Sequence, residues 1–261
     1  MSAATALAHD VRGSGPPVLF LHAFPLNRAM WDAQVRALSG SYQVVRFDAR
    51  GFGGTPPGDG LLTMERIADD AAALLDQLGL SRATVCGLSM GGYAALAFVR
   101  RHPDRLKALV LADTRTAPDS VEGRRSRAAQ AEKVRREGPA AIADAFLKNA
   151  LGATTQAERP EVIARVKEMI LAAPARGIVD ALAGLAARAD SAPTLREIRV
   201  PTLVVCGAED AITPVADAEA IHRGVPGSTL VILRGAGHLS SLEDPAAFNR
   251  ALLDFLGAHA V

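Results

Sequence analysis

Gly87-Leu88-Ser89-Met90-Gly91 is the stretch of this sequence that decides the fold. A short apolar run, 83–87, leads into it, and a helical pattern continues from Met90 to Arg101. The spacing G-x-S-x-G between a strand and a helix predicts a tight, strained turn whose serine projects above a sheet and whose neighbours must be small. A turn that merely packs a strand against a helix would also fit these five residues alone. The flanking patterns favour the first interpretation, with Ser89 as a nucleophile.

Further apolar runs of similar length lie on both sides of this turn. Each is short and rich in β-branched residues, as expected for strands buried on both faces of a parallel sheet. They cover 18–21, 44–47, 108–111, 203–206 and 230–233, and the stretch before Gly13 predicts one or two edge strands. Because helical patterns separate several of these runs, we expect an α/β fold with a doubly wound, mostly parallel sheet.

Capping residues predict where several of the helices begin and end. Thr63 has the pattern of the N-cap of a helix that ends at Gly79, and Asp244 that of the N-cap of the last helix. Thr213 is expected to cap another helix, with Pro214 in its first turn.

The stretch 115–195 interrupts this alternation of strands and helices. It is rich in Ala, Arg and Glu and has no convincing strand pattern. We therefore expect a helical cap, inserted over the carboxyl ends of the strands. The core domain then comprises 1–114 and 196–261, and the cap comprises 115–195.

The composition argues against several classes of protein. With 49% hydrophobic and 22% charged residues, the 261-residue chain has an ordinary globular composition. A net charge of +1 and 4% aromatic residues argue against nucleic-acid and membrane partners. Cys86 and Cys206 are too few for a disulfide framework, and we expect free thiols. No cluster has the spacing of a zinc site, so we expect no metal and no cofactor. The start lacks a basic stretch followed by a long apolar run, which predicts a cytoplasmic location.

A serine nucleophile needs a base, and an imidazole base needs an acid that orients it. His238 follows the last apolar run, where a loop can bring the imidazole over Ser89. Asp210 follows the preceding apolar run and is the favoured acid. Asp113, one strand earlier, is its rival, and Glu209 is a weaker one.

An oxyanion formed at this serine needs two backbone donors. One is the N–H of Met90, which follows the nucleophile, and we expect the second to be the N–H of Phe24, in the loop after an early strand. His22 and Trp31 are candidates for the substrate pocket. A histidine that braces the loop is the favoured interpretation of His22, and a place in a helix core is the favoured one for Trp31.

Taken together, these motifs resemble the α/β-hydrolase superfamily over nearly the whole chain. The similarity is greatest to the branch of 3-oxoadipate enol-lactonases, small carboxylesterases and cofactor-free haloperoxidases, or perhydrolases. The matching segments are His22–Pro25, Phe47–Gly53, 87–92, Gly207–Pro214 and Gly235–His238. Ala23 stands where the family often has Gly, and because alanine is also small we expect the oxyanion hole to be preserved. The resemblance implies the α/β-hydrolase fold and the order Ser, Asp, His for the triad.

The function expected from these residues is hydrolysis of small carboxylic esters through an acyl-enzyme on Ser89. Lactone hydrolysis, including that of enol-lactones, is the alternative within the same class, with a perhydrolase side activity. A non-catalytic protein that binds a small ligand on this fold is the alternative from a different class. The expected partner is a small ester or lactone, and the oligomeric state stays open.

Overall fold

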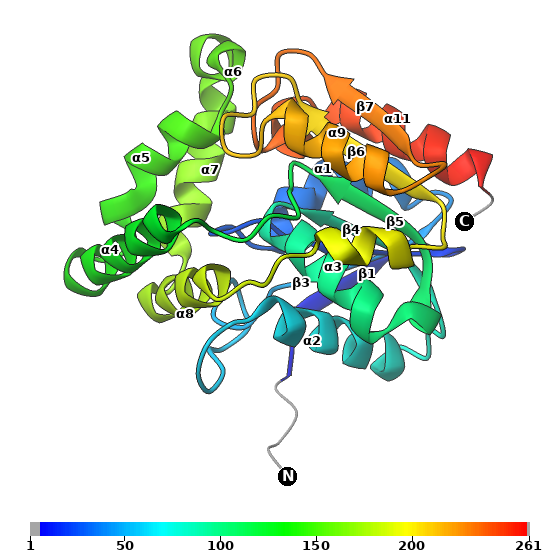
Figure 1. The fold of residues 1–261 in the computed structure, drawn as a ribbon, viewed down its shortest axis with the longest axis horizontal. Helices are drawn as coiled ribbons and strands as arrows, with labels where there is room; N and C mark the ends of the chain where they lie inside the picture. The colour runs from blue at the N-terminus through cyan, green and yellow to red at the C-terminus, as the bar shows by residue number, and fades with distance from the viewer. Residues whose placement is uncertain (1–5, 260–261) are drawn as a thin grey trace.

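A computed structural model describes residues 6–259, in which the strands form one seven-stranded sheet (Figure 1). The strands are β1 (His9–Arg12), β2 (Pro17–Leu21), β3 (Gln43–Phe47), β4 (Ala83–Leu88), β5 (Leu106–Ala112), β6 (Thr202–Gly207) and β7 (Thr229–Leu233). Their spatial order is β1-β3-β2-β4-β5-β6-β7. Only β1 runs antiparallel to its neighbour, β3, and the other described pairs are parallel. The predicted doubly wound, mostly parallel sheet is confirmed, and the stretch before Gly13 forms one edge strand.

Helices flank this sheet and begin close to where the capping residues predict. The core helices are α1 (Asp32–Leu38), α2 (Met64–Gln77), α3 (Met90–Arg101), α9 (Val215–Gly224), α10 (Ser240–Glu243) and α11 (Pro245–Ala258), with 3₁₀ turns η1 (Arg28–Trp31), η2 (Pro103–Arg105) and η3 (Ala192–Glu197). Thr63 caps α2 by accepting from the N–H of Arg66, and Asp244 caps α11 by accepting from the N–H of Ala247. The prediction for Thr213 is wrong, because Pro214 is the N-cap of α9.

Between β5 and β6 the chain forms the cap, which stands to one side of the sheet in Figure 1. The cap helices are α4 (Val121–Glu137), α5 (Ala140–Ala150), α6 (Ala153–Glu158), α7 (Pro160–Ala172) and α8 (Ala175–Ala186). Helix α4 packs against α8, and α5 packs against α7. No strand occurs in the described chain between Ala112 and Thr202, so the inserted helical cap of the predicted fold is present. Residues 1–5 and 260–261 of the expected core domain lie outside the described residues.

No single helix among residues 6–259 is both long and apolar enough to cross a membrane. The helices α7 and α8 reach that length and hydropathy only as a pair, and the chain bends by 97° between them.

Cys86 in β4 and Cys206 in β6 are both free and buried, which confirms the prediction of free thiols. Strand β5 lies between their strands, so the two thiols are on next-but-one strands of the sheet. Burial raises the pKa of both thiols, and nearby carboxyl groups add to this effect at Cys206.

Helix α8 attaches the cap to the core through two close backbone approaches at glycines. A Cβ atom on Gly177 would lie 1.8 Å from the carbonyl oxygen of Gly51, and one on Gly184 would lie 1.9 Å from that of Leu62. No side chain fits at either position without moving the backbone. At these two points the backbones of the cap and the core therefore approach each other too closely for any residue but glycine.

Gly184→Ala should lower the melting temperature by several degrees. Alanine ordinarily favours a helix over glycine by about 0.5–1 kcal/mol, but forcing a methyl group into a packed contact costs about 1–3 kcal/mol. Gly257→Ala in α11 is the matched control, because its new Cβ would meet nothing within 4 Å. Calorimetry should show Gly257→Ala at or above the wild-type melting temperature. Equal stability of the two variants would contradict the close contact.

Candidate active site

Ser89 lies at the turn between β4 and α3, in a backbone conformation that few side chains adopt. Its φ of 55° and ψ of −112° fall outside the common regions for a residue other than glycine. The neighbouring glycines make this turn possible. A Cβ on Gly87 would lie 2.1 Å from the carbonyl oxygen of Gly91, and one on Gly91 would lie 2.1 Å from that of Leu21. The turn therefore presents Ser89 at the carboxyl edge of the sheet, where the residue remains 9% exposed.

The structure brings together the three residues that the sequence analysis selected as a triad. The Nε2 atom of His238 lies 2.7 Å from the Oγ of Ser89, and its Nδ1 lies 2.8 Å from the Oδ2 of Asp210. The three residues follow β4, β6 and β7, whose carboxyl ends meet at one edge because the strands are parallel. A carboxylate only accepts hydrogen bonds, so Nδ1 carries the proton and Nε2 is free to accept one from the serine.

Asp210 is held by a turn of its own chain. Its Oδ1 accepts from the N–H groups of Ile212 (2.8 Å) and Thr213 (2.9 Å), and its Oδ2 accepts from the Thr213 hydroxyl (2.6 Å). Burial acts to raise the pKa of Asp210, but the His238 imidazole and the bonds from Thr213 outweigh it, and the net pKa is lowered. The carboxylate thus stays charged beside the imidazole. This role of Thr213 was not predicted from the sequence, although an Asp that caps its own turn is a recognisable signal.

The two rival acids, Asp113 and Glu209, make hydrogen bonds to other groups and not to His238. Asp113 accepts from the N–H of Gly207 (2.9 Å) and from the Ser240 hydroxyl. Burial raises its pKa well above the usual range, and the nearby charge of Asp210 raises it further. Glu209 accepts two hydrogen bonds from Thr154 of the cap. Of the three acids, Asp210 alone contacts His238.

Asp113, Cys206 and Asp210 also form the one described group whose ligand atoms lie close enough, within 4.8 Å, to hold a metal ion. Metal ligands must be deprotonated. Burial raises the pKa of both Asp113 and Cys206, which opposes their deprotonation, and the Cys206 thiol donates to the carbonyl oxygen of Gly207. The oxygens of Asp210 already bind His238 and Thr213. The chemistry of this group therefore fits a hydrogen-bonded core and not a metal centre.

Two backbone donors are available for an oxyanion. Within the described chain, the N–H groups of Phe24 and Met90 have no hydrogen-bond acceptor. Met90 is the first residue of α3, where helical geometry leaves the N–H without an internal partner. The loop around Phe24 is held by its neighbours, because Ala23 donates to the sulfur of Met30 (3.2 Å) and accepts from Leu26 (2.9 Å). Alanine at position 23 fits into this loop with its side chain fully buried.

His22 braces the same loop. Its Nε2 accepts from the N–H of Ala49 (3.0 Å), so its Nδ1 carries the proton and donates to the carbonyl oxygen of Ala23 (2.9 Å). Burial lowers its pKa, although the Ala23 carbonyl and Asp48 act in the opposite direction. Both ring nitrogens are therefore occupied, which is the bracing role that the sequence favoured.

Trp31 is fully buried and packs between other core aromatic rings. Its ring centroid lies 4.7 Å from that of Phe20 and 6.0 Å from that of Phe248. These contacts match the favoured interpretation of Trp31 as a core residue and give no support to the alternative, a place in the substrate pocket. A cap residue that the sequence analysis missed does reach the oxyanion loop, since the ring of Phe146 in α5 lies edge to face with that of Phe24 at 6.4 Å. No sequence pattern indicated this contact, because it depends on how the cap is placed.

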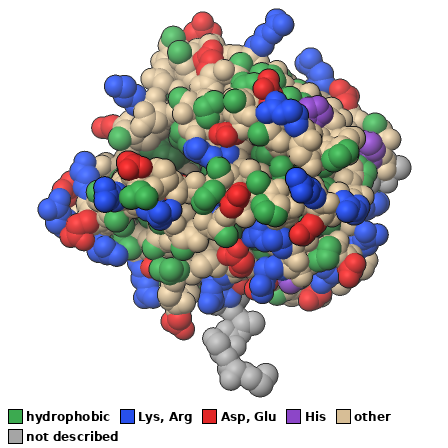
Figure 2. All heavy atoms as spheres, in the orientation of Figure 1, with side chains coloured by type: hydrophobic (Ala, Val, Ile, Leu, Met, Phe, Trp, Pro, Cys, Tyr) green, Lys and Arg blue, Asp and Glu red, His purple; other side chains and the backbone are tan. Residues whose placement is uncertain are grey.

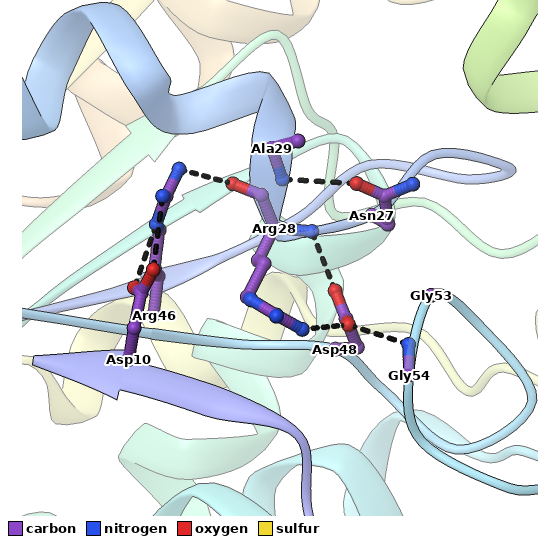
Figure 3. Close-up of a pocket in the computed structure, with 8 residues that line it drawn as sticks. All are labelled: Asp10, Asn27, Arg28, Ala29, Arg46, Asp48, Gly53 and Gly54. Carbon is purple, nitrogen blue, oxygen red and sulfur yellow. Dashed lines mark hydrogen bonds and ion pairs between the residues drawn. The ribbon is translucent and has the colours of Figure 1, made fainter.

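A separate hollow of about 270 Å³ lies beside β1 and η1 (Figure 3). Its lining residues are Asp10, Asn27, Arg28, Ala29, Arg46, Asp48, Gly53 and Gly54. Asp48 accepts from the N–H groups of Arg28 and Gly54, both at 2.8 Å, and also pairs with the Arg28 guanidinium. The charge of Asp48 is therefore paired within the hollow, and none of the three triad residues lines the hollow. Basic and acidic side chains are likewise interspersed over the face shown in Figure 2.

Comparison with known proteins agrees with this geometry. The family model for the alpha/beta hydrolase fold matches residues 16–245. A thermophilic esterase from Thermogutta terrifontis shares 42% identity, with a TM-score of 0.95 over 98% of this chain and 94% of that one. The enol-lactonase from Burkholderia xenovorans shares 32% identity, with a TM-score of 0.91 over 98% of both chains. The 3-oxoadipate enol-lactonase 2 of Acinetobacter baylyi is 30% identical over 91% of this chain and 87% of its own length.

The chain belongs to the α/β-hydrolase superfamily. Within it, the chain lies in the branch that holds enol-lactonases and small esterases, and it is an ester hydrolase of this esterase and lactonase type.

Thr213→Val should reduce kcat about tenfold, because it removes the hydroxyl group that donates to the charged Asp210 carboxylate and holds it beside His238. A hydrogen bond to a charged group contributes ~1.5–3 kcal/mol. Thr213→Ser is the matched control, since it keeps the hydroxyl and loses only a methyl group. Steady-state hydrolysis of p-nitrophenyl acetate measures both variants. A Val variant as active as the Ser variant would show that the hydroxyl does not support the acid.

Proposed function

We propose that this protein is a serine carboxylesterase that cleaves small carboxylic esters through an acyl-enzyme on Ser89. The observation that carries the proposal is the continuous chain of hydrogen bonds from Ser89 through His238 to Asp210, with distances of 2.7 and 2.8 Å. The 42% identity with an esterase supports an ester as the substrate.

In this mechanism the Oγ of Ser89 attacks the ester carbonyl carbon while Nε2 of His238 takes the hydroxyl proton. The carbonyl oxygen becomes an oxyanion, which the N–H groups of Phe24 and Met90 bind. Collapse of this intermediate breaks the bond to the alcohol, which leaves with the proton from His238. A water then gives its proton to His238 and attacks the acyl-enzyme, and the acid is released as Ser89 regains its proton.

Lactone hydrolysis is the second candidate and would use the same residues. It is supported by the similarity to two enol-lactonases, with identities of 30% and 32%. The two substrates differ in one respect, because the alcohol of an opened lactone stays attached to the acyl group. Parallel kcat/KM measurements on a linear ester and on a lactone of equal carbon number would rank the two activities.

Ser89→Ala should remove at least about three decades of kcat on p-nitrophenyl acetate, the loss typical of a missing triad residue. A fluorophosphonate probe should label the wild-type protein on a peptide that contains Ser89 and should leave the Ala variant unlabelled. A protein that only binds a ligand need not have an activated serine. Turnover near the wild-type rate in the Ala variant would therefore rule out the proposal.

Short acyl chains, of about two to six carbons, should be preferred, a range that follows from ordinary pocket sizes. The ring of Phe24 in the oxyanion loop meets those of Phe52 and Phe146 edge to face, so bulky side chains gather at this loop. Each methylene that fits should add up to ~0.8 kcal/mol, and each that does not fit should lose more. In a p-nitrophenyl ester series kcat/KM should rise and then fall. A continuous rise to twelve carbons would contradict this.

A further inference from the structure

The loop that carries the catalytic base is held through its backbone by three different parts of the molecule. The N–H of His238 donates to the carbonyl oxygen of Ala150 in the cap at 2.7 Å. The next N–H, of Leu239, donates to Oε1 of Glu243 at 3.0 Å. The third, of Ser240, donates to Oδ2 of Asp113 at 3.3 Å. Each of these consecutive amides thus depends on a separate acceptor.

Besides the direct backbone bond from His238 to Ala150, the side chain of Glu243 also joins the cap to the base loop. It lies in α10 and is 1% exposed. Its second carboxylate oxygen, Oε2, accepts from the N–H of Gly152 in the cap at 2.8 Å. One buried carboxyl group therefore bridges a cap amide and the amide that directly follows His238. Glu243 takes no part in the proton transfers of the proposed reaction, so its burial has another cause.

The cap approaches the base loop closely at this point. A Cβ on Gly237 would lie 2.3 Å from the backbone nitrogen of Gly152, and a Cβ on Gly152 would lie 2.5 Å from Oε2 of Glu209. Thr154 adds a second link, to Glu209 beside the catalytic acid. Figure 1 shows the α5–α6 junction next to the loops that follow β6 and β7. Residues 150–154 are thus a fixed support for both loops.

We propose that Glu243 is a positioning residue that ties His238 to the cap, so that the cap sets the geometry of the base as well as covering the site. The reason is geometric. If the bridge is removed, the N–H groups of Leu239 and Gly152 lose their acceptor in a buried place, and the loop must shift to satisfy them. Even a small shift would change the 2.7 Å contact between His238 and Ser89, on which proton transfer depends.

The test uses Glu243→Ala and Glu243→Gln with p-nitrophenyl acetate, a substrate small enough to make few contacts of its own with the cap. Glu243→Ala should lower kcat about tenfold or more with KM within about twofold, because the base moves while binding is retained. The rate of fluorophosphonate labelling at Ser89 should fall by the same factor. Glu243→Gln keeps one acceptor oxygen, so its kcat should lie between those of the wild type and the Ala variant.

Hydrogen exchange tests the link to the cap. In Glu243→Ala, peptides that cover 149–155 and 236–242 should both exchange faster, because the bridge protects one amide in each. Asp70→Asn is the matched control. Its carboxyl group is also buried and makes two bonds of 2.7 Å to Arg50, away from the base loop. It should lower the melting temperature without changing kcat at temperatures where the protein is folded.

The inference rests on the proposed function, and the outcomes separate the two. A wild-type protein that took up no label would overturn both. If the wild-type protein is labelled but kcat is unchanged in Glu243→Ala, the positioning role alone is overturned. The same holds if Asp70→Asn lowers kcat as much as Glu243→Ala does. Unchanged exchange at 149–155 would overturn the link to the cap. If Glu243→Ala does not fold, Glu243→Gln decides the question, since it keeps the side-chain shape and should still lower kcat about threefold or more.

Discussion

The backbone conformation of Ser89 is the constraint on which the rest of this structure depends. A residue with φ of 55° is tolerated only where the surroundings compel it, and here β4, α3 and β2 meet too closely for a side chain at Gly87 or Gly91. The same conformation ends the strand, starts the helix and leaves the Met90 amide without a helical partner. The proposed nucleophile, one proposed oxyanion donor and a helix N-terminus therefore come from one turn. The parallel sheet then places the proposed acid and base, Asp210 and His238, at the same edge.

The electrostatic surroundings shift the pKa values of two neighbouring acids, Asp210 and Asp113, in opposite directions. Asp210 and Asp113 are both buried, and two carboxyl groups at such a distance do not both ionise readily. His238 and Thr213 lower the pKa of Asp210, whereas burial and the charge of Asp210 raise the pKa of Asp113. One acid can therefore orient the imidazole while the other supports the backbone of Gly207 and Ser240. The chemical difference between them comes from their neighbours, since both side chains are aspartic acid.

The cap is built into the core through backbone contacts. Gly177 and Gly184 of α8 rest on the core loops at Gly51 and Leu62, and Gly152 rests on Gly237 beside the base. Contacts of this kind are short and leave little room to slide, because backbone atoms cannot change rotamer. The aromatic contact between Phe146 and Phe24 adds a side-chain link at the oxyanion loop. The cap can thus influence both the shape of the substrate site and the position of the base.

The sequence by itself determined the sheet, the tight turn at Ser89 and the identity of the triad candidates, because these depend on local patterns. Apolar runs, capping residues such as Thr63 and Asp244, and the small residues around Ser89 each act within a few positions of the chain. The choice of Asp210 over Asp113 was favoured by order along the chain, but only the tertiary structure placed one of them on His238. The cap contacts of Ala150, Gly152 and Phe146 could not be predicted at all, since they join segments many residues apart through single backbone atoms or ring edges. Such contacts leave no periodic pattern in a sequence, and they exist only once the cap has packed against the core.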